Sequence, residues 1–401
     1  MKNILLISNL YPNKYSIYHT HICHSFVKEW SKKGYNVTVI QTKSVFPNLY
    51  YRLASIFKSI ATTYVGSDKL DKFRLSKPTD CSFDDVNVHV IPLFKYIPHS
   101  NYSSRTLDKT LMQILDKIND LNFTPDIILG HFINPQLNLV RKLKESFPNS
   151  ITSVVIHEKA ELISKSYNVT ELRSLINHID FIGFRSVSLL NSFEKLYFKV
   201  ENSFINYSGI PNYFLLGPPK RNFNNKSFNI IFVGQFIKRK YPSIILDSIS
   251  GISENINKIK YIGSGSEEIN IRNSALNLGL HKKIEIINDI PRTSIIDYYD
   301  EADLFIMISK GEAYGLVYLE AMSRGCITIG SINEGIDGVI VDGFNGFLAK
   351  AGDSKSLSNI ISKISQLSDI EIRTIQQNAI NTSRKFTDEI TSLDYLNKLK
   401  K

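Results

Sequence analysis

Cysteine is scarce in this chain of 401 residues, and its placement rules out a framework of disulfides. The three cysteines, Cys23, Cys81 and Cys326, are odd in number and far apart in the sequence. None of them belongs to a Cys-x-x-Cys pair, the spacing typical of zinc and redox sites. The sequence therefore predicts a protein of a reducing compartment that is stabilised by a packed core.

Long hydrophobic runs are lacking as well. No stretch approaches the ~18 apolar residues that a membrane-spanning helix requires. The first apolar run, residues 4–7, is followed at once by polar residues and is too short for a signal peptide. We therefore expect a soluble or peripheral protein of the cytoplasm.

The motifs of several nucleotide and metal enzymes are also absent. The sequence contains neither a P-loop nor an Asp-x-Asp motif. The turn at residues 263–265 is followed by two glutamates and lacks the third glycine of a dinucleotide fingerprint. The run that begins with His157 and Glu158 lacks the second histidine of a zincin. We expect no metal and no cofactor, so that helix termini and basic side chains would hold any diphosphate.

What is present throughout is an alternation of strand-length apolar runs with amphipathic segments of helical length. Short, almost wholly apolar strands predict parallel sheets covered on both faces. The predicted fold class is therefore α/β. Because the length exceeds the usual ceiling for one core, we expect two domains, each of them Rossmann-like. The predicted strands are residues 4–8, 36–40, 86–91, 126–130, 152–156, 181–184, 204–206, 229–233, 258–262, 284–287, 304–308, 326–329 and 346–348.

A break between the domains is predicted at residues 217–227, where Gly, Pro and Asn dominate and the apolar periodicity stops. Residues 1–216 would form the first domain and residues 228–385 the second. Residues 386–401 would form a helix that could pack back on the first domain. Since ligands of parallel sheets bind at the carboxyl ends of the strands, we expect the loops of both domains to meet at a cleft.

The net charge of +10 is unevenly spread, because residues 28–77 hold 10 Lys and Arg against 3 Asp and Glu. Such a zone indicates an anionic partner. Apolar residues at Leu53, Ile56, Phe57, Ile60 and Tyr64 follow helical spacing within residues 50–65. This stripe would lie in a membrane interface with its cations on anionic lipid, or it would pack on the sheet. No motif of nucleic-acid recognition accompanies it, so we expect no nucleic acid as a partner.

The strongest constellation of polar residues follows the apolar run at 304–308. Gly315 permits a tight turn into a helix whose first N–H groups and dipole favour phosphate. Glu312 before the turn and Glu320 beyond it could bind hydroxyl groups on either side of that phosphate. An ordinary surface helix with glutamates near its start is the alternative reading.

A second group of residues follows the strand at 229–233. Gly234 is followed by Gln235, and then by Arg239 and Lys240, whose charges suit a diphosphate. A solvated basic loop is the alternative. The glycines of the turn Gly263-Ser264-Gly265 follow the next predicted strand.

Taken in order, these motifs resemble glycosyltransferase family 4, a large family of retaining GT-B enzymes. Glu312 and Glu320 match the Glu-x7-Glu motif of the family, residues 234–240 its Gly-Arg-x4-Lys loop, and residues 263–265 its Gly-x-Gly turn. The resemblance covers residues 228–350. It implies transfer of a sugar, with retention of anomeric configuration, from a UDP- or GDP-sugar to a hydroxyl of a glycan or lipid-linked glycan.

The resemblance also implies roles for single residues. Glu312 would contact the transferred sugar, Glu320 the ribose and Lys240 the diphosphate. Gln235 stands where the family has arginine, and Arg239 would compensate for the missing charge. The donor site would further include Gly263, Gly265, Ile290, Tyr314, Gly315, Leu316 and Val317.

Two places in the first half carry candidate histidines. His157 ends an apolar strand and resembles the family histidine that lies against the donor sugar, although Glu158 stands where the family has glycine. His19 and His21 lie near the place of the family's glycine-rich loop. We expect them to line the acceptor side, with packing at a helix start and, less readily, metal binding as alternatives.

Two other functions stay open. A GT-B epimerase would use a different set of cleft carboxylates and histidines, and a non-catalytic sugar-nucleotide-binding scaffold would show no donor hydrolysis. The abundance of Ile, Asn and Lys suggests an AT-rich bacterial genome. Family habit then implies polysaccharide biosynthesis, of capsule or lipopolysaccharide, at the inner face of the plasma membrane.

Overall fold

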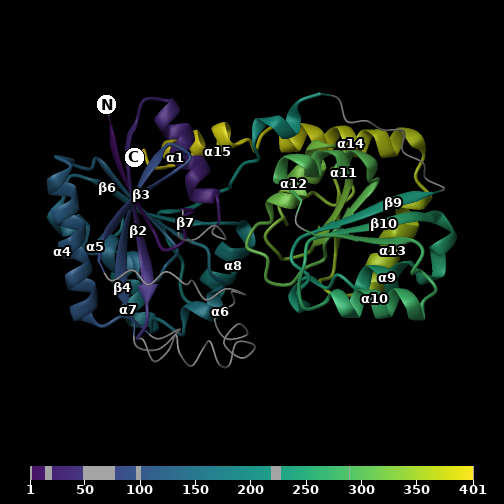
Figure 1. Ribbon diagram of the computed structural model, residues 1–401, viewed down its shortest axis with the longest axis horizontal. Coiled ribbons are helices and arrows are strands. Elements are labelled where there is room, and N and C mark those ends of the chain that lie inside the picture. Colours follow the sequence, from purple (N-terminus) through teal and green to yellow (C-terminus); the bar gives the residue numbers. More distant parts are fainter. Residues whose placement is uncertain are drawn as a thin grey trace. The chain divides into compact units, whose positions relative to one another are not determined.

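The computed structural model describes residues 2–13, 20–47, 77–95, 101–217, 227–288 and 290–400 (Figure 1). The chain divides into two compact units. Unit 1 comprises Met1–Arg185, Leu190–Asn206 and Ser392–Lys401, and unit 2 comprises Ser186–Leu189 and Tyr207–Thr391. The division therefore falls at Asn206, ahead of the linker predicted at 217–227, and the last ten residues belong to unit 1.

Unit 1 is built on an eight-stranded sheet with the order β3-β4-β2-β1-β5-β6-β7-β8. Its central strands are buried along almost their whole length, as their apolar sequences predict. The strands are β1 (Asn3–Ser8), β2 (Asn36–Val45), β3 (Thr79–Phe83), β4 (Val86–Phe94), β5 (Ile127–His131), β6 (Ile151–Ile156), β7 (Phe181–Phe184) and β8 (Ser203–Ile205).

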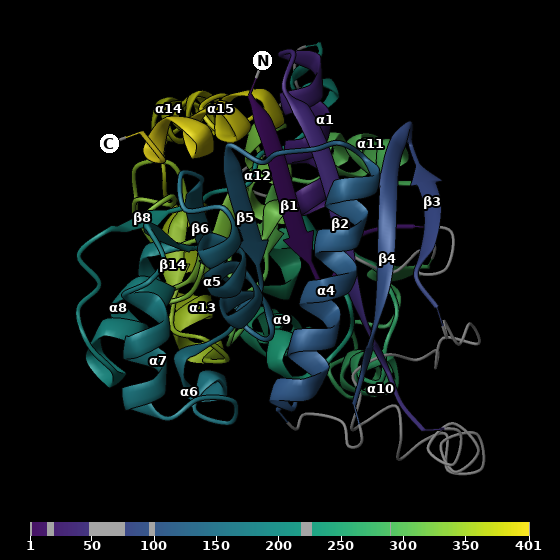
Figure 2. The ribbon, with the colours of Figure 1, turned by 90° about the vertical axis from the view of Figure 1, so that its left-hand side faces the viewer.

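Helices cover both faces of this sheet. Figure 2 shows α4 (Ser104–Asp120) and α5 (Gln136–Ser146) in front of it. On the other face, α1 (Ile22–Lys32) and α15 (Asp388–Lys398) share one core with alternate residues of the strands, among them Leu6, Leu129 and Val155. The shorter helices are α6 (Ala160–Ile163) and α7 (Val169–Ile176), and α8 (Val187–Leu196) crosses the division between the units.

One edge of the first sheet differs from the expectation of purely parallel pairing. β3 pairs antiparallel with β4, whereas the remaining neighbours pair in parallel. The strand was not predicted because its sequence, TDCSF, is mostly polar and buries only Cys81. A strand at a sheet edge needs few apolar residues, so periodicity does not reveal it.

Unit 2 is built on a six-stranded, wholly parallel sheet with the order β11-β10-β9-β12-β13-β14. Its strands are β9 (Phe228–Val233), β10 (Ile256–Ile262), β11 (Ile284–Ile287), β12 (Leu304–Ile306), β13 (Ile327–Ser331) and β14 (Phe347–Ala349). The helices around it are η1 (Asn212–Leu215), η2 (Lys238–Lys240), α9 (Ile244–Ile249), η3 (Ser250–Asn255), α10 (Glu268–Asn277), η4 (Arg292–Ser294), α11 (Ile295–Glu301), α12 (Leu316–Ser323), α13 (Ser354–Ser365) and α14 (Asp369–Ser383). Each predicted strand of the two halves overlaps an observed one.

This strand order explains why the donor-site candidates gather in unit 2. β11, β10, β9 and β12 are consecutive neighbours and run in one direction, so their carboxyl ends share one edge of the sheet. The loops after them carry Ile290, the Gly263–Gly265 turn, residues 234–240 and residues 310–315 respectively. The ends of these loops, Gly234 and Gly315, are 81 positions apart in the sequence but lie at the same edge of the sheet. Within the described ranges, no helix combines the length and apolarity that crossing a bilayer would take.

Candidate active site

Three charged residues of two neighbouring loops converge in unit 2. Arg239 and Lys240 belong to η2, after β9, and Glu312 lies between β12 and α12. The Nη1 atom of Arg239 lies 3.3 Å from Oε2 of Glu312, and Nζ of Lys240 lies 3.6 Å from the same oxygen. The structure thus brings together the predicted phosphate-binding cations and the predicted sugar-binding carboxylate.

The surroundings of Lys240 differ from those of Arg239. The side chain of Lys240 is 13% exposed and that of Arg239 is 45% exposed. Burial lowers the pKa of Lys240; the charge of Glu312 raises it again, and that of Arg239 lowers it. Nζ of Lys240 also contacts Sδ of Met307 at 3.6 Å. An anion that enters this cluster would therefore meet one partly desolvated cation and one solvated cation.

The loop that carries Glu312 is held in place by backbone hydrogen bonds. The amide of Lys310 donates to the carbonyl of Arg239 at 2.7 Å, which joins the two loops. Oε2 of Glu334 accepts from the amides of Gly311 and Glu312 at 2.7 and 2.9 Å. Glu334 was not among the predicted site residues, because no sequence motif distinguishes it from a surface glutamate.

Gly315 forms the turn that starts α12. Its φ of +85° lies in the left-handed region, and an added Cβ would lie 2.5 Å from the ring of Tyr318. No side-chain hydrogen bond caps the helix there. The predicted donor-site residues Leu316 and Val317 are the first two residues of α12 and are half-buried. The start of this helix is therefore suited to an anion in the way its sequence predicts.

The two glycines after β10 pack against the loop after β9. Gly263 and Gly265 have positive φ values, and a Cβ on Gly265 would lie 2.4 Å from the carbonyl oxygen of Phe236. The amide of Phe236 donates to the carbonyl of Ser264 at 2.8 Å. The Gly-x-Gly turn thus sets the position of the residues that precede Arg239 and Lys240.

Glu320, the second carboxylate of the motif, is almost completely buried and already has partners. Nε and Nη2 of Arg292 donate to its Oε1 at 3.2 and 2.6 Å, and the hydroxyl of Tyr299 donates to its Oε2 at 3.3 Å. The guanidinium of Arg292 also lies over the ring of Phe214, 5.9 Å from its centroid. Arg292 was not among the predicted site residues, although it follows the predicted strand at 284–287 about as closely as Arg239 follows the strand at 229–233.

Three further donor-site candidates have different surroundings. Gln235, which replaces the family arginine, is exposed. Ile290 is half-buried after the end of β11. Tyr314 is buried, and its ring packs 5.3 Å from that of Tyr207.

His157 lies in unit 1, directly after β6, and is held on several sides. Its Nε2 lies 3.0 Å from Nδ1 of His131, the last residue of β5. The ring of Phe132 stacks on it with 4.0 Å between centroids. The carboxylate of Glu158 accepts from the amides of His157 and Ile133 at 3.0 to 3.2 Å. Glu158 therefore binds the backbone of two loops, which gives a structural reason for its replacing the family's glycine.

The histidine pair is neutral at physiological pH. Burial, together with the charge of Arg185, lowers the pKa of His131 to about 3. The same causes, and the neighbouring His131, hold the pKa of His157 well below its usual value. Burial raises the pKa of Glu158, although its backbone hydrogen bonds oppose this shift.

The candidate acceptor-side histidines are described only in part. His19 lies outside the described residues. His21 precedes α1 and is exposed, with its ring 5.7 Å from that of Phe83 and 6.4 Å from that of His24. His24 in turn bonds the hydroxyl of Tyr11 and the carboxylate of Asp84 at 3.0 and 3.1 Å. His21 thus borders a packed polar network at the start of the helix.

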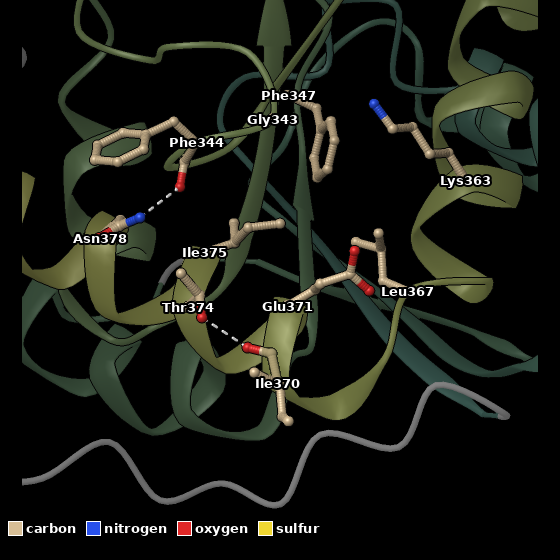
Figure 3. A pocket seen from close by; sticks show the side chains of 10 residues that line it. All are labelled: Gly343, Phe344, Phe347, Lys363, Leu367, Ile370, Glu371, Thr374, Ile375 and Asn378. Carbon is tan, nitrogen blue, oxygen red and sulfur yellow. Dashed lines mark hydrogen bonds between the residues drawn. The ribbon is translucent and has the colours of Figure 1, made fainter.

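Two other kinds of site to consider among the described residues are a metal-binding group and a surface pocket. Among the described residues, no group of three or more His, Cys, Asp or Glu side chains is arranged to hold a metal ion. Figure 3 shows a pocket of about 430 Å³ between β14, α13 and α14 in unit 2. Its ten lining residues include Phe347, Lys363 and Glu371, and none of the predicted site residues.

Comparison with known proteins shows similarity to glycosyltransferases. Residues 217–384 match the family described as glycosyl transferases group 1. The chain is 21% identical over 344 residues to N-acetyl-alpha-D-glucosaminyl L-malate synthase of Bacillus anthracis, covering 83% of this chain and 80% of the relative.

Solved structures share the fold over the whole chain. The lipopolysaccharide outer core galactosyltransferase WaaB has a TM-score of 0.69 at 15% identity, covering 99% of both chains. Anabaena HepE in complex with UDP has a TM-score of 0.68 at 15% identity, covering 100% of this chain and 99% of that one. The chain therefore has the GT-B fold, which it shares with the galactosyltransferase WaaB, and its residues 217–384 match the family of glycosyl transferases group 1.

Proposed function

We propose that this protein transfers a sugar from a nucleoside diphosphate-sugar to a hydroxyl of a glycan or lipid-linked glycan, with retention of anomeric configuration. The observation that carries the proposal is the convergence of Arg239 and Lys240 on Glu312 beside the start of α12. Two cations and a helix N-terminus form a site for a diphosphate, and a carboxylate next to them can accept hydrogen bonds from a sugar.

The charges of this cluster suit a leaving group that becomes more negative as the sugar departs. Lys240 would bind the diphosphate as a compact charge, and the N–H groups at the start of α12 would bind it through the helix dipole. When the cations bind the diphosphate, Glu312 loses part of its ion pairing and can accept hydrogen bonds from sugar hydroxyls. Its proposed role is to position the sugar and to stabilise developing positive charge.

The second carboxylate would serve the nucleoside end of the donor. A carboxylate has about four lone-pair sites, so Glu320 can accept from ribose hydroxyls while it keeps Arg292 and Tyr299. UDP is the first nucleotide to test, since HepE, which shares the fold, binds it.

The proposed setting is bacterial surface-polysaccharide synthesis at the inner face of the plasma membrane. The likeness to WaaB, a lipopolysaccharide galactosyltransferase, supports an acceptor of that kind. Residues 50–77, the proposed contact with anionic lipid, lie outside the described residues except for Lys77. No metal and no cofactor takes part in this proposal.

The proposal is tested by donor binding and donor hydrolysis. A panel of UDP- and GDP-sugars is screened by thermal shift, and the donor that stabilises most is then followed for release of its nucleotide without acceptor. Lys240→Ala should lower both readouts, and Lys238→Ala, an exposed neighbour in η2, serves as the matched control. Absence of stabilisation by every donor would overturn the proposal, whereas stabilisation without hydrolysis or transfer would identify a scaffold.

A further inference from the structure

His157 has a buried partner that the proposed function does not use. His131 ends β5 and is paired in register with Val155 of β6, two residues before His157. Because alternate residues of a strand share a face, His131 lies on the same face as Leu129, which is covered by α1 and α15. His131 is completely buried, between the rings of Phe26 at 6.0 Å and Tyr395 at 5.8 Å.

We propose that His131 is a positioning residue whose Nδ1–H donates to Nε2 of His157 and so keeps the proton of His157 on Nδ1. His157 then presents an N–H donor at its second ring nitrogen, and its lone pair is occupied by His131. The consequence for catalysis rests on the proposed sugar transfer and on the resemblance of His157 to the family histidine that lies against the donor sugar: His157 would then donate to a sugar hydroxyl and would not act as a general base.

The direction of this hydrogen bond follows from the other nitrogen of His131. A neutral histidine has one N–H and one lone pair. If His157 donated instead, His131 would carry its proton on Nε2, which is buried and has no hydrogen-bond partner among the described residues. Buried N–H groups without an acceptor are rarer in proteins than acceptors that are not fully used.

The charge near the pair opposes protonation of either ring. Arg185 is buried, and its charge, together with burial, lowers the pKa of both histidines. Both rings are therefore neutral, so the arrangement in which one imidazole is doubly protonated does not arise.

The remaining contacts fix the plane of the His157 ring and leave Nδ1 for a ligand. Phe132 stacks on one face of the ring at an interplanar angle of 24°, and its own amide donates to the carbonyl of Val155 at 3.0 Å. Glu158 binds backbone amides and not the imidazole. The hydrogen bond to His131 is thus the contact that selects which nitrogen carries the proton.

The test reads the tautomer directly. The full chain is labelled with ¹⁵N in histidine, and two-bond ¹H–¹⁵N spectra at pH 7.5 distinguish the Nδ1–H, Nε2–H and doubly protonated forms. His178 is an internal reference, because its Nδ1 lies 2.7 Å from the carbonyl of Ser174, which can only accept. His157→Asn assigns the signal of His157, for which we expect the Nδ1–H form.

Variants of His131 then test the cause. His131→Asn retains an N–H donor in place of Nδ1 and should keep the Nδ1–H form of His157, whereas His131→Phe should shift His157 toward Nε2–H. His178→Asn, the matched control in the turn after α7, should leave the His157 signal unchanged.

Two results would overturn the inference. The first is a spectrum of the wild type in which His157 carries its proton on Nε2. This result does not depend on whether the His131→Phe variant folds. The second is an unchanged Nδ1–H form in folded His131→Phe. Lack of donor hydrolysis with an intact tautomer would count against the proposed function and not against this role of His131.

Discussion

At the scale of single residues, Lys240 and Glu320 are predicted to recognise different parts of one nucleotide. Lys240 is partly desolvated and faces Glu312, whereas Glu320 is buried against Arg292 and Tyr299. A phosphate contact distinguishes UDP from uridine, and a ribose contact does not. The two ligands therefore separate the two assignments.

Lys240→Ala is expected to weaken UDP binding about tenfold to a hundredfold, because a charged hydrogen bond contributes about 1.5–3 kcal/mol. Binding of uridine should change little. Calorimetry with both ligands measures the difference, and Lys238→Ala controls for general loss of positive charge. Equal losses for UDP and uridine would remove Lys240 from the phosphate site.

Gln235→Arg should preserve or tighten UDP binding if Gln235 occupies the place of the family arginine.

Glu320→Ala is expected to weaken UDP and uridine alike, again about tenfold to a hundredfold. The substitution also leaves the guanidinium of Arg292 without its carboxylate, so the free energy of unfolding should fall by about 1–3 kcal/mol. Thermal unfolding separates this loss from the loss of binding. Glu320→Gln keeps the shape and removes the charge, and unchanged affinity in both variants would contradict the ribose assignment.

At the scale of elements, the loop between β12 and α12 depends on Glu334 for its position. One carboxylate oxygen of Glu334 accepts from two successive amides of that loop. Glu334→Ala should therefore reduce UDP affinity and donor turnover, although Glu334 is not expected to touch the donor. Glu334→Gln retains an oxygen acceptor and should stay close to wild type. If both variants behave alike, the hydrogen bonds to the loop do not position Glu312.

The two buried histidines at the ends of β5 and β6 are expected to make unit 1 less stable in mild acid. The pKa values of His131 and His157 in the folded chain lie below the ordinary 6.5. Below pH 6.5 the unfolded chain therefore binds protons that the folded chain does not, and the free energy of unfolding falls by about 1.4 kcal/mol per pH unit for each histidine. The raised pKa of Glu158 acts with the opposite sign, at pH values above its ordinary 4.5.

The fluorescence of Trp30, the single tryptophan and a buried residue of unit 1, reports this transition. Urea midpoints at pH 7.5 and 5.5 should differ clearly in the wild type. They should differ less in the double variant His131→Asn, His157→Asn. The burial of His24, whose pKa is also lowered, leaves part of the pH dependence in place. An equal acid shift in both proteins would contradict the assignment to this pair.

At the scale of the whole molecule, the basic zone predicts salt-sensitive binding to anionic vesicles. Each surface cation contributes about 1 kcal/mol near an anionic bilayer, so four to six of them suffice for peripheral binding. Binding should be lost when Arg52, Lys58, Lys69 and Lys72 are replaced by glutamine. The control carries the same loss of charge in exposed residues of unit 2, namely Lys282, Lys355, Arg373 and Lys385. A wild type that stays soluble in low-salt flotation would contradict the membrane proposal.

The sequence by itself determined the two α/β sheets, the loops that carry Arg239, Lys240 and Glu312, and the glycines that shape them. These features depend on local patterns: short apolar strands, a glycine where the backbone must turn, and charged residues directly after a strand. The edge strand β3 was not predicted, because only one of its residues is buried and its sequence therefore shows no apolar pattern.

Only the tertiary structure decided which side chains meet. Arg292 and Glu320 are 28 residues apart, and the indole of Trp30 donates to the carbonyl of Ser392 across 362 residues. Pairing across such distances depends on strand order and on the packing of helices, which a local pattern does not encode. The pairing of His131 with His157 could not be predicted for the same reason. It depends on the register of β5 and β6, because His157 follows the neighbouring strand.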